Sequence, residues 1–213
     1  MTDTKPMTFD GEHDVIVAGG GSAGCVVAAR LTENPGLDVV LLEAGPPDKD
    51  PWIHIPMGFG KLVPDPGHNW GYTTEPEPHL DNRQIVWPRG KVLGGSGSIN
   101  GLVFMRGAPT DFDQWERLGA KGWAYKDVLP YFKKLEANSR GASAHRGGSG
   151  PMAVTDIAKP SASARAWVEA CTALQHPANE DFNGEKVDGV GFCQLNTRDG
   201  RRCSTAVAYL HPV

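Results

Sequence analysis

The stretch His13–Gly45, HDVIVAGGGSAGCVVAARLTENPGLDVVLLEAG, decides the fold class. Its first apolar run, residues 13–18, is typical of a buried parallel strand. Residues 22–32 carry alanine, valine and leucine at helical spacing, and the Asn-Pro-Gly sequence at 34–36 ends that helix. Residues 37–42, LDVVLL, predict a second buried strand. A strand, a helix and a strand in such a short stretch form a βαβ unit, so we expect a right-handed crossover in a parallel sheet.

The glycines that follow the first strand match the dinucleotide-binding pattern G-x-G-x-x-G. Gly19 permits a tight turn, Gly21 lets the backbone approach a pyrophosphate, and Gly24 lets the helix pack close to the strand. The first helical turn, which includes Ser22 and Ala23, offers free N–H groups and a partial positive charge to that phosphate. A tight turn without a ligand is the alternative interpretation of the motif.

An acidic residue, Glu43, ends the second strand 19 positions after Gly24. A carboxylate at this position accepts hydrogen bonds from both ribose hydroxyls, and it repels a 2′-phosphate. Together with the glycine motif, Glu43 therefore predicts an adenine dinucleotide without that phosphate, which is FAD or NAD.

A second glycine-rich segment, RGKVLGGSGSING, runs from Arg89 to Gly101 and leads into the apolar run 102–105. A flavin ring requires the backbone to come very close along one face, and glycines leave that approach open. Serine hydroxyls in the same segment can hydrogen-bond the diphosphate or the ribityl chain. The glycines are Gly94, Gly95 and Gly97, and the serines are Ser96 and Ser98. The segment therefore favours FAD over NAD, with an Ω-loop that binds no ligand as the alternative.

Taken together, these motifs resemble those of the glucose–methanol–choline (GMC) oxidoreductases, and most of all the bacterial choline dehydrogenase-like members. The likeness extends from about Asp14 to Pro212, and its second glycine segment is the part most specific to the family. The segments that carry it are GGGSAG (19–24), LLEAG (41–45), NWGYTTEPEP (69–78), PRGKVLGGSGSINGLVFMRG (88–107), DFDQWERLG (111–119) and GRRCSTAVAYLHP (200–212).

The resemblance implies FAD as the cofactor and a set of contacts with it. The pyrophosphate would lie at the first motif, the adenosine ribose at the acidic residue, and the flavin ring along the second motif, with a tryptophan near the adenine or a lid. The cofactor-binding residues implied are Gly19, Gly21, Ser22, Ala23, Gly24, Glu43, Ala44, Trp70, Val92, Gly94, Gly95, Ser96, Asn100, Gly101, Leu102 and Val103.

Two positions in the second segment have more specific implications. Asn100 is expected to fix the edge of the isoalloxazine through its side chain and backbone. Some family members attach FAD covalently through a histidine at the position of Ile99. Isoleucine cannot form that bond, so the resemblance implies noncovalent FAD.

The family oxidises the CH–OH group of alcohols by passing a hydride from the alcohol carbon to flavin N5, while a histidine takes the hydroxyl proton. That histidine lies near the C-terminus of chains more than twice this length, so we assign no catalytic residue here and expect the base beyond Val213. Since general base catalysis contributes about 10²–10⁴-fold, we expect this chain alone to be nearly inert. The alternatives are a noncatalytic, truncated FAD-binding module and an FAD-containing hydroxynitrile lyase-type member.

The resemblance implies an α/β fold: a Rossmann-like FAD-binding domain with the start of an α+β substrate domain, and therefore an incomplete fold. Residues 12–155 would form the first part of the FAD-binding domain. Residues 156–203 would cross into the substrate-binding domain, and 204–213 would return. A parallel sheet that lacks strands exposes apolar surface, so we expect the chain alone to be poorly soluble or to bind FAD weakly.

Helical periodicity predicts further helices at 111–118, 126–137, 161–174 and 205–210. Thr110 and Asp113 resemble a capping pair for the first of them, and Ser204 a cap for the last. In the second, Pro130 would fall in the first turn, where a missing N–H is tolerated, and Glu136 would lie on the polar side.

The composition sets the remaining expectations. A net charge of −4 gives no electrostatic reason to expect nucleic acid as a partner. The four cysteines are scattered without a C-x-x-C pair, which argues against disulfides or a metal site and is consistent with the cytoplasm. Residues 1–13 do not resemble a signal peptide, and no run is long and apolar enough to span a membrane. The expected partner is a small alcohol substrate, and oligomerisation of the full-length protein is left open.

Overall fold

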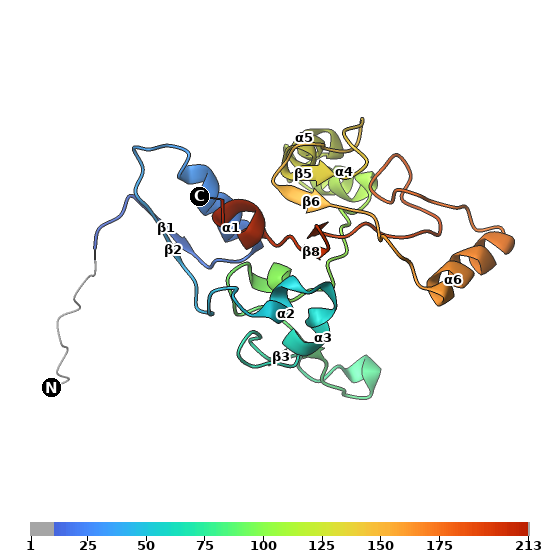
Figure 1. Cartoon of the computed structure of the whole chain (residues 1–213), viewed down its shortest axis with the longest axis horizontal. Coiled ribbons are helices and arrows are strands. Elements are labelled where there is room, and N and C mark those ends of the chain that lie inside the picture. The colour runs from blue at the N-terminus through green and yellow to red at the C-terminus, as the bar shows by residue number, and fades with distance from the viewer. Residues whose placement is uncertain (1–10, 213) are drawn as a thin grey trace.

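The βαβ unit predicted at the start of the chain is present in the computed structural model, which describes residues 11–212. Strand β1 (Val15–Ala18) is followed by helix α1 (Ser22–Leu31) and strand β2 (Val39–Leu42). The two strands pair in parallel, and α1 packs beside them (Figure 1). Both predicted strands and the predicted helix are therefore confirmed, although the strands are shorter than expected.

The prediction that these two strands are buried was wrong. Ile16 is 62% exposed and Leu42 is 55% exposed, although both are large apolar residues. A parallel sheet is normally covered on both faces. Within residues 11–212 this sheet has only two strands, so much of its apolar surface remains open to solvent. The expected exposure of apolar surface in an incomplete sheet is confirmed.

Short elements follow β2 and form the lower part of the molecule in Figure 1. They include an antiparallel hairpin, β3 with β4, and three short helical turns that lead to it. Their bounds are α2 (Pro51–His54), η1 (Pro56–Gly58), α3 (Phe59–Leu62), β3 (Tyr72–Thr73), η2 (Pro78–Leu80), β4 (Val86–Trp87) and η3 (Gly95–Ser98).

The remainder of the chain forms a second lobe and then returns to α1. The helix α6 projects from the far end of this lobe, whereas η4 lies against α1 (Figure 1). The elements are α4 (Pro109–Arg117), α5 (Tyr125–Leu135), β5 (Glu136–Asn138), β6 (Met152–Val154), α6 (Ala162–Ala173), β7 (Thr197–Arg198), β8 (Arg201–Arg202) and η4 (Ala206–Leu210). All four predicted helices are present, the last as a π-helix.

The expected details at the helix ends are partly wrong. Asp111, not Asp113, caps α4: its carboxylate accepts from the Ala108 N–H at 2.9 Å. Asp113 instead accepts from the Tyr125 N–H at 3.0 Å and so joins α4 to α5. Pro130 lies inside α5 rather than in its first turn. At the last helix, the Ser204 hydroxyl accepts from the Val207 N–H at 3.2 Å, as a cap would.

The prediction for Glu136 was wrong. It was expected on the polar side of a helix that continues to residue 137, but the helix ends at Leu135. Glu136 begins β5 and is 0% exposed. A buried carboxylate requires cationic or hydrogen-bonding partners, which helical periodicity alone does not show.

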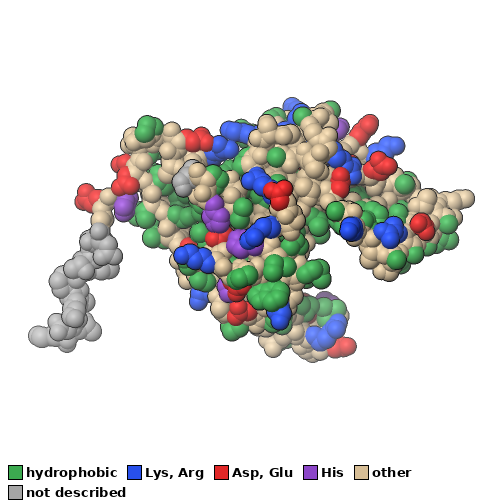
Figure 2. Space-filling model, viewed as in Figure 1, with side chains coloured by type: hydrophobic (Ala, Val, Ile, Leu, Met, Phe, Trp, Pro, Cys, Tyr) green, Lys and Arg blue, Asp and Glu red, His purple; other side chains and the backbone are tan. Residues whose placement is uncertain are grey.

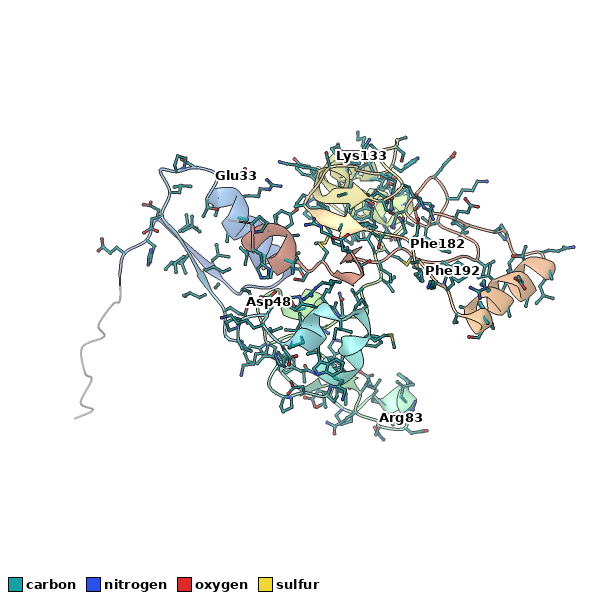
Figure 3. All side chains as sticks on the ribbon, in the orientation of Figure 1. Glu33, Asp48, Arg83, Lys133, Phe182 and Phe192 are labelled. Carbon is teal, nitrogen blue, oxygen red and sulfur yellow. The ribbon has the colours of Figure 1, made fainter. Side chains whose placement is uncertain are left out.

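Two clusters of buried apolar residues hold these parts together. The larger cluster joins α1, β6 and η4 through Ala29, Val154, Tyr209 and their neighbours. The end of the chain is also tied to the segment after β2, since His211 Nε2 lies 3.0 Å from Asp48 Oδ1; Figure 3 labels Asp48 at this junction. The division into a first FAD-binding part, a crossover and a return stays a prediction.

The surface carries charges of both signs. Figure 2 shows Lys and Arg side chains interspersed with Asp and Glu side chains on the face in view. None of the helices described within residues 11–212 has the length and apolar character needed to cross a membrane.

Candidate cofactor-binding site

The two glycine motifs touch each other, backbone against backbone. Gly94 N–H donates to Gly20 O at 2.7 Å, which ties the second motif to the first. Gly95 has φ +56°, and a Cβ on it would lie 2.7 Å from Gly21 Cα. Only glycine allows both this conformation and this approach. Two turns that are more than 70 residues apart in the sequence are therefore in direct contact.

This contact changes the reason for the glycines in the second motif. They were expected to leave room for a flavin ring. Instead, a side chain on Gly94 would clash with Ser98 Oγ, and a Cβ on Gly97 would lie 3.1 Å from Ser22 Oγ. The directions in which these side chains would point are filled by the protein itself. Packing within and between the two motifs accounts for these glycines without reference to a ligand.

The first motif leaves the N-terminus of α1 free of a side-chain cap. Gly21 is the N-cap residue, and no side chain in the described chain caps this helix. The N–H groups of the first turn are then available to an anion, and the helix dipole favours negative charge there. Gly19 turns the chain with φ +96°, and any side chain on Gly24 would clash with Gly19 O. The thiol of Cys25 is fully buried, and burial raises its pKa.

The carboxylate of Glu43 is fixed at the end of β2 by both of its oxygens. Oε2 accepts from the Gly20 N–H at 2.7 Å, and Oε1 accepts from the Gly45 N–H at 2.8 Å. Each carboxylate oxygen has a second lone pair, so Glu43 can still accept two hydroxyl groups. This geometry suits a ribose beside the glycine turn.

A cleft of about 660 Å³ opens between the two motifs. Eight of the predicted residues line it: Gly19, Gly21, Ser22, Glu43, Ala44, Trp70, Gly95 and Ser96. Four residues that were not predicted also line it: Ala18, Leu42, Arg89 and Gly90. Ala18 and Leu42 are the last residues of β1 and β2, and ligands of open α/β sheets bind at the carboxyl ends of strands. That rule was the available signal for both.

The other predicted residues lie outside the cleft lining: Ala23, Gly24, Val92, Gly94, Asn100, Gly101, Leu102 and Val103. Val92 is 0% exposed and packs with Ile53, Leu62 and Ile99, so its side chain faces the core. Leu102 is also buried, whereas Val103 is 53% exposed. Contact with FAD by any residue of the predicted set stays a prediction.

The serines of the second motif have different surroundings. Ser96 lines the cleft, and its hydroxyl accepts from the Gly90 N–H at 3.0 Å. Ser98 is fully buried and donates its hydroxyl to Leu93 O at 2.7 Å. The expectation that Ser98 is available to a diphosphate or ribityl chain was therefore wrong.

Aromatic and cationic side chains border the cleft at its Trp70 end. Trp70 stacks on Tyr72 with ring centroids 6.1 Å apart, and Lys91 Nζ lies 4.8 Å from the Trp70 ring centroid. Arg89 lines the cleft, with its guanidinium 5.3 Å from the ring centroid of Trp87. Because Arg89 lines the same cleft as Gly21 and Ser22 at the start of α1, the cleft combines a cation with a free helix N-terminus, which suits phosphate groups.

Arg202, which was not predicted as a site residue, binds the C-terminal end of the second motif. Its buried guanidinium donates to Gly97 O at 3.1 Å and to Asn100 O at 2.8 Å. No local signal in the sequence pairs Arg202 with residues about 100 positions earlier.

A βαβ crossover, a glycine turn and an acid at the end of the second strand define a dinucleotide-binding α/β protein. A family model described as GMC oxidoreductase matches residues 13–213, and the chain belongs to this family. The expected family and fold class are thereby confirmed.

Two curated relatives with high similarity to this chain are choline dehydrogenases. The mitochondrial choline dehydrogenase of Mus musculus is 44% identical over 209 residues, which cover 95% of this chain and 35% of that relative. The oxygen-dependent choline dehydrogenase of Sinorhizobium fredii is 47% identical over 201 residues, which cover 94% of this chain and 37% of the relative. The chain therefore spans little more than a third of the length of these relatives.

Two solved structures of other proteins are also similar to this chain. Pyridoxine 4-oxidase from Mesorbium loti superposes with a TM-score of 0.89 at 36% identity, over 93% of this chain and 39% of that one. An FAD-dependent oxidoreductase from Chaetomium thermophilum superposes with a TM-score of 0.86 at 28% identity, over 95% of this chain and 37% of that one. Family and structural neighbours together support FAD over other dinucleotides.

The residues around the cleft fit the adenosine diphosphate part of FAD. The uncapped α1 N-terminus, the fixed carboxylate of Glu43 and the cation Arg89 surround one cleft, and Lys91 lies over the ring of Trp70 at its border. These are the donor and acceptor types that a pyrophosphate and a ribose require.

Proposed function

We propose that this chain forms the FAD-binding part of an oxidoreductase that acts on the CH–OH group of an alcohol. The observation that carries the proposal is the cleft in which both glycine motifs, Glu43 and Arg89 meet. A plain tight turn needs neither the second motif nor a fixed carboxylate. FAD would supply the acceptor for a hydride from the alcohol carbon.

In this proposal the residues of the chain bind and orient the cofactor. The first-turn N–H groups of α1 hold the pyrophosphate, and Glu43 accepts the ribose hydroxyls. FAD binds noncovalently, because Ile99 has no nucleophilic atom and its side chain is 2% exposed within the core. No residue among the 213 is assigned as the catalytic base.

The substrate, the location and the domain division belong to the same proposal. Choline is one candidate alcohol, since both relatives described above are choline dehydrogenases. A cytoplasmic location is proposed from the sequence, although one of these relatives is mitochondrial. Residues 12–155 and 204–213 would serve the cofactor, and 156–203 would cross toward the substrate region.

Titration of FAD with the purified chain tests the proposal. We expect saturable quenching of flavin fluorescence, with competition by ADP, which has the adenosine diphosphate part, and no competition by riboflavin at equal concentration. Tighter binding of NAD than of FAD, or no saturation by either, would refute it. The alcohol step is tested with the complete gene product, where choline or another primary alcohol should bleach the visible flavin absorbance without oxygen.

A further inference from the structure

Arg202 is a buried cation whose hydrogen-bond acceptors are neutral backbone and amide oxygens. Its side chain is almost completely buried, and no ion pair to it is present within residues 11–212. The guanidinium donates instead to Ile53 O at 2.7 Å, Gly97 O at 3.1 Å, Asn100 Oδ1 at 2.8 Å and Asn100 O at 2.8 Å. Burial lowers the pKa of Arg202 to about 10, so the group remains charged at neutral pH.

These contacts determine which way the amide of Asn100 faces. Its Oδ1 atom accepts from Arg202 Nη1 and also from the Leu102 N–H at 3.0 Å. Both partners carry only donors, so the atom that faces them must be the amide oxygen. The Nδ2 group is therefore turned the other way, and the described chain offers it no hydrogen-bond acceptor.

Asn100 does not itself line the cleft, but its backbone is hydrogen-bonded to a residue that does. Asn100 is exposed, and its N–H donates to the O atom of Ser96, a cleft-lining residue, at 2.9 Å. Leu102 is held at φ +66°, an unusual conformation for leucine, by the same Asn100 oxygen. The local backbone thus keeps Asn100 in one orientation.

We propose that Arg202 is a positioning residue that fixes Asn100 as a hydrogen-bond donor toward the ring system of the cofactor. The inference rests on the proposed function, since the acceptor would be a carbonyl oxygen or ring nitrogen of the isoalloxazine. Arg202 does not touch the ligand. Together with the Leu102 N–H it occupies the only acceptor atom of the side-chain amide, which leaves the two N–H bonds of Nδ2 for the ligand.

Asn100→Asp separates this role from a structural one. Aspartate still accepts from Arg202 and Leu102, and it gives the buried guanidinium a counter-charge. It presents an oxygen in place of the outward N–H groups. We therefore expect a higher melting temperature together with FAD binding weakened about tenfold, the cost of roughly one lost hydrogen bond.

Arg202→Met tests the positioning, with Arg201→Met as the matched control because Arg201 is the exposed neighbour. We expect Arg202→Met to weaken FAD binding at least tenfold and to shift the visible flavin spectrum, while Arg201→Met leaves both unchanged.

Each outcome is decisive. Unchanged or tighter FAD binding by Asn100→Asp would overturn the inference, as would a lower melting temperature in that variant. If Arg202→Met does not fold, Asn100→Asp still decides. Failure of the unmodified protein to bind FAD would refute the proposed function instead, so the two failures are distinguishable.

Discussion

The contact between the glycine motifs and the region around Glu136 hold the molecule together by opposite means. At the first, Gly95 brings two backbones together because it has no side chain, and a Cβ on it would lie 2.7 Å from Gly21 Cα. At the second, Glu136 is fully buried between Arg106 and Arg146, whose side chains are 2% and 4% exposed. The glycine contact depends on a missing side chain, whereas the region around Glu136 depends on each of its charged groups.

The network around Glu136 is closely connected. Glu136 pairs with Arg106 through Oε2 and with Arg146 through Oε1, the second pair at 2.9 Å. Asn138 Nδ2 also donates to Glu136 Oε1 at 2.8 Å. Burial lowers the pKa of Arg146, although the neighbouring Glu136 opposes this. The comparison predicts that removing one charge here costs more than adding one methyl group at the glycine contact.

Glu136→Gln should therefore have the largest effect. It leaves two buried guanidinium groups without their shared carboxylate, and breaking a buried ion pair on one side costs about 3–5 kcal/mol. The measurement is urea unfolding of the purified protein. Glu169→Gln makes the same change on an exposed residue of α6 and should shift stability by less than about 0.5 kcal/mol. Equal effects of the two changes would break the comparison.

Gly95→Ala should have the next largest effect. It places a methyl group 2.7 Å from Gly21 Cα at a residue with φ +56°, so we expect backbone strain and overpacking to cost about 2–3 kcal/mol in total. Gly60→Ala is the control, because no atom lies within 4 Å of its added Cβ and Gly60 is not one of the predicted cofactor-binding residues. Urea unfolding should show a loss of stability only for Gly95→Ala, and FAD titration should show weaker binding by this variant. A stable Gly95→Ala protein would contradict the role assigned to the contact.

The sequence predicted the glycine motifs of the first region, although not the contact between them, and it did not predict the second region. Gly19, Gly21, Gly24 and Glu43 lie in one βαβ unit, where the backbone geometry of a turn dictates residue type at fixed spacing. Arg106, Glu136 and Arg146 are brought together only by tertiary folding, and charged residues are usually exposed.

The same difference explains the errors within the candidate site. Eight predicted residues line the cleft because motif spacing places them there. Val92 was expected along the flavin, yet its side chain packs in a core cluster with Ile53 and Leu62. Sequence shows that a glycine segment approaches something closely; it does not show whether that neighbour is a ligand or another part of the backbone.

Glu43→Gln sharpens the comparison from the ligand side. One carboxylate oxygen becomes an NH₂ group, which faces a backbone N–H of Gly20 or Gly45 in place of an acceptor. We expect FAD binding weakened by about 1–2 kcal/mol, or roughly tenfold, with a smaller loss of stability than Gly95→Ala. Fluorescence titration measures the first and urea unfolding the second. Unchanged FAD affinity would exclude Glu43 as the ribose acceptor.

Asp156→Asn should have the smallest effect, because it changes the exposed edge of the charged region. Hydrogen bonds from Arg140, and then from Gln194, lower the pKa of Asp156 below its ordinary value of 3.8. Such a carboxylate contributes stability above pH 3.8, and the contribution is lost as the pH falls through the lower pKa of the folded state. Its side chain is 46% exposed, so solvent screening limits the contribution to at most about 0.5–1 kcal/mol.

Unfolding curves at about pH 6 and about pH 3 should show the unmodified protein more stable than Asp156→Asn at the higher pH, with a smaller difference at the lower pH. A difference that grows toward acid would mean that the ion pair with Arg140 does not stabilise the folded state.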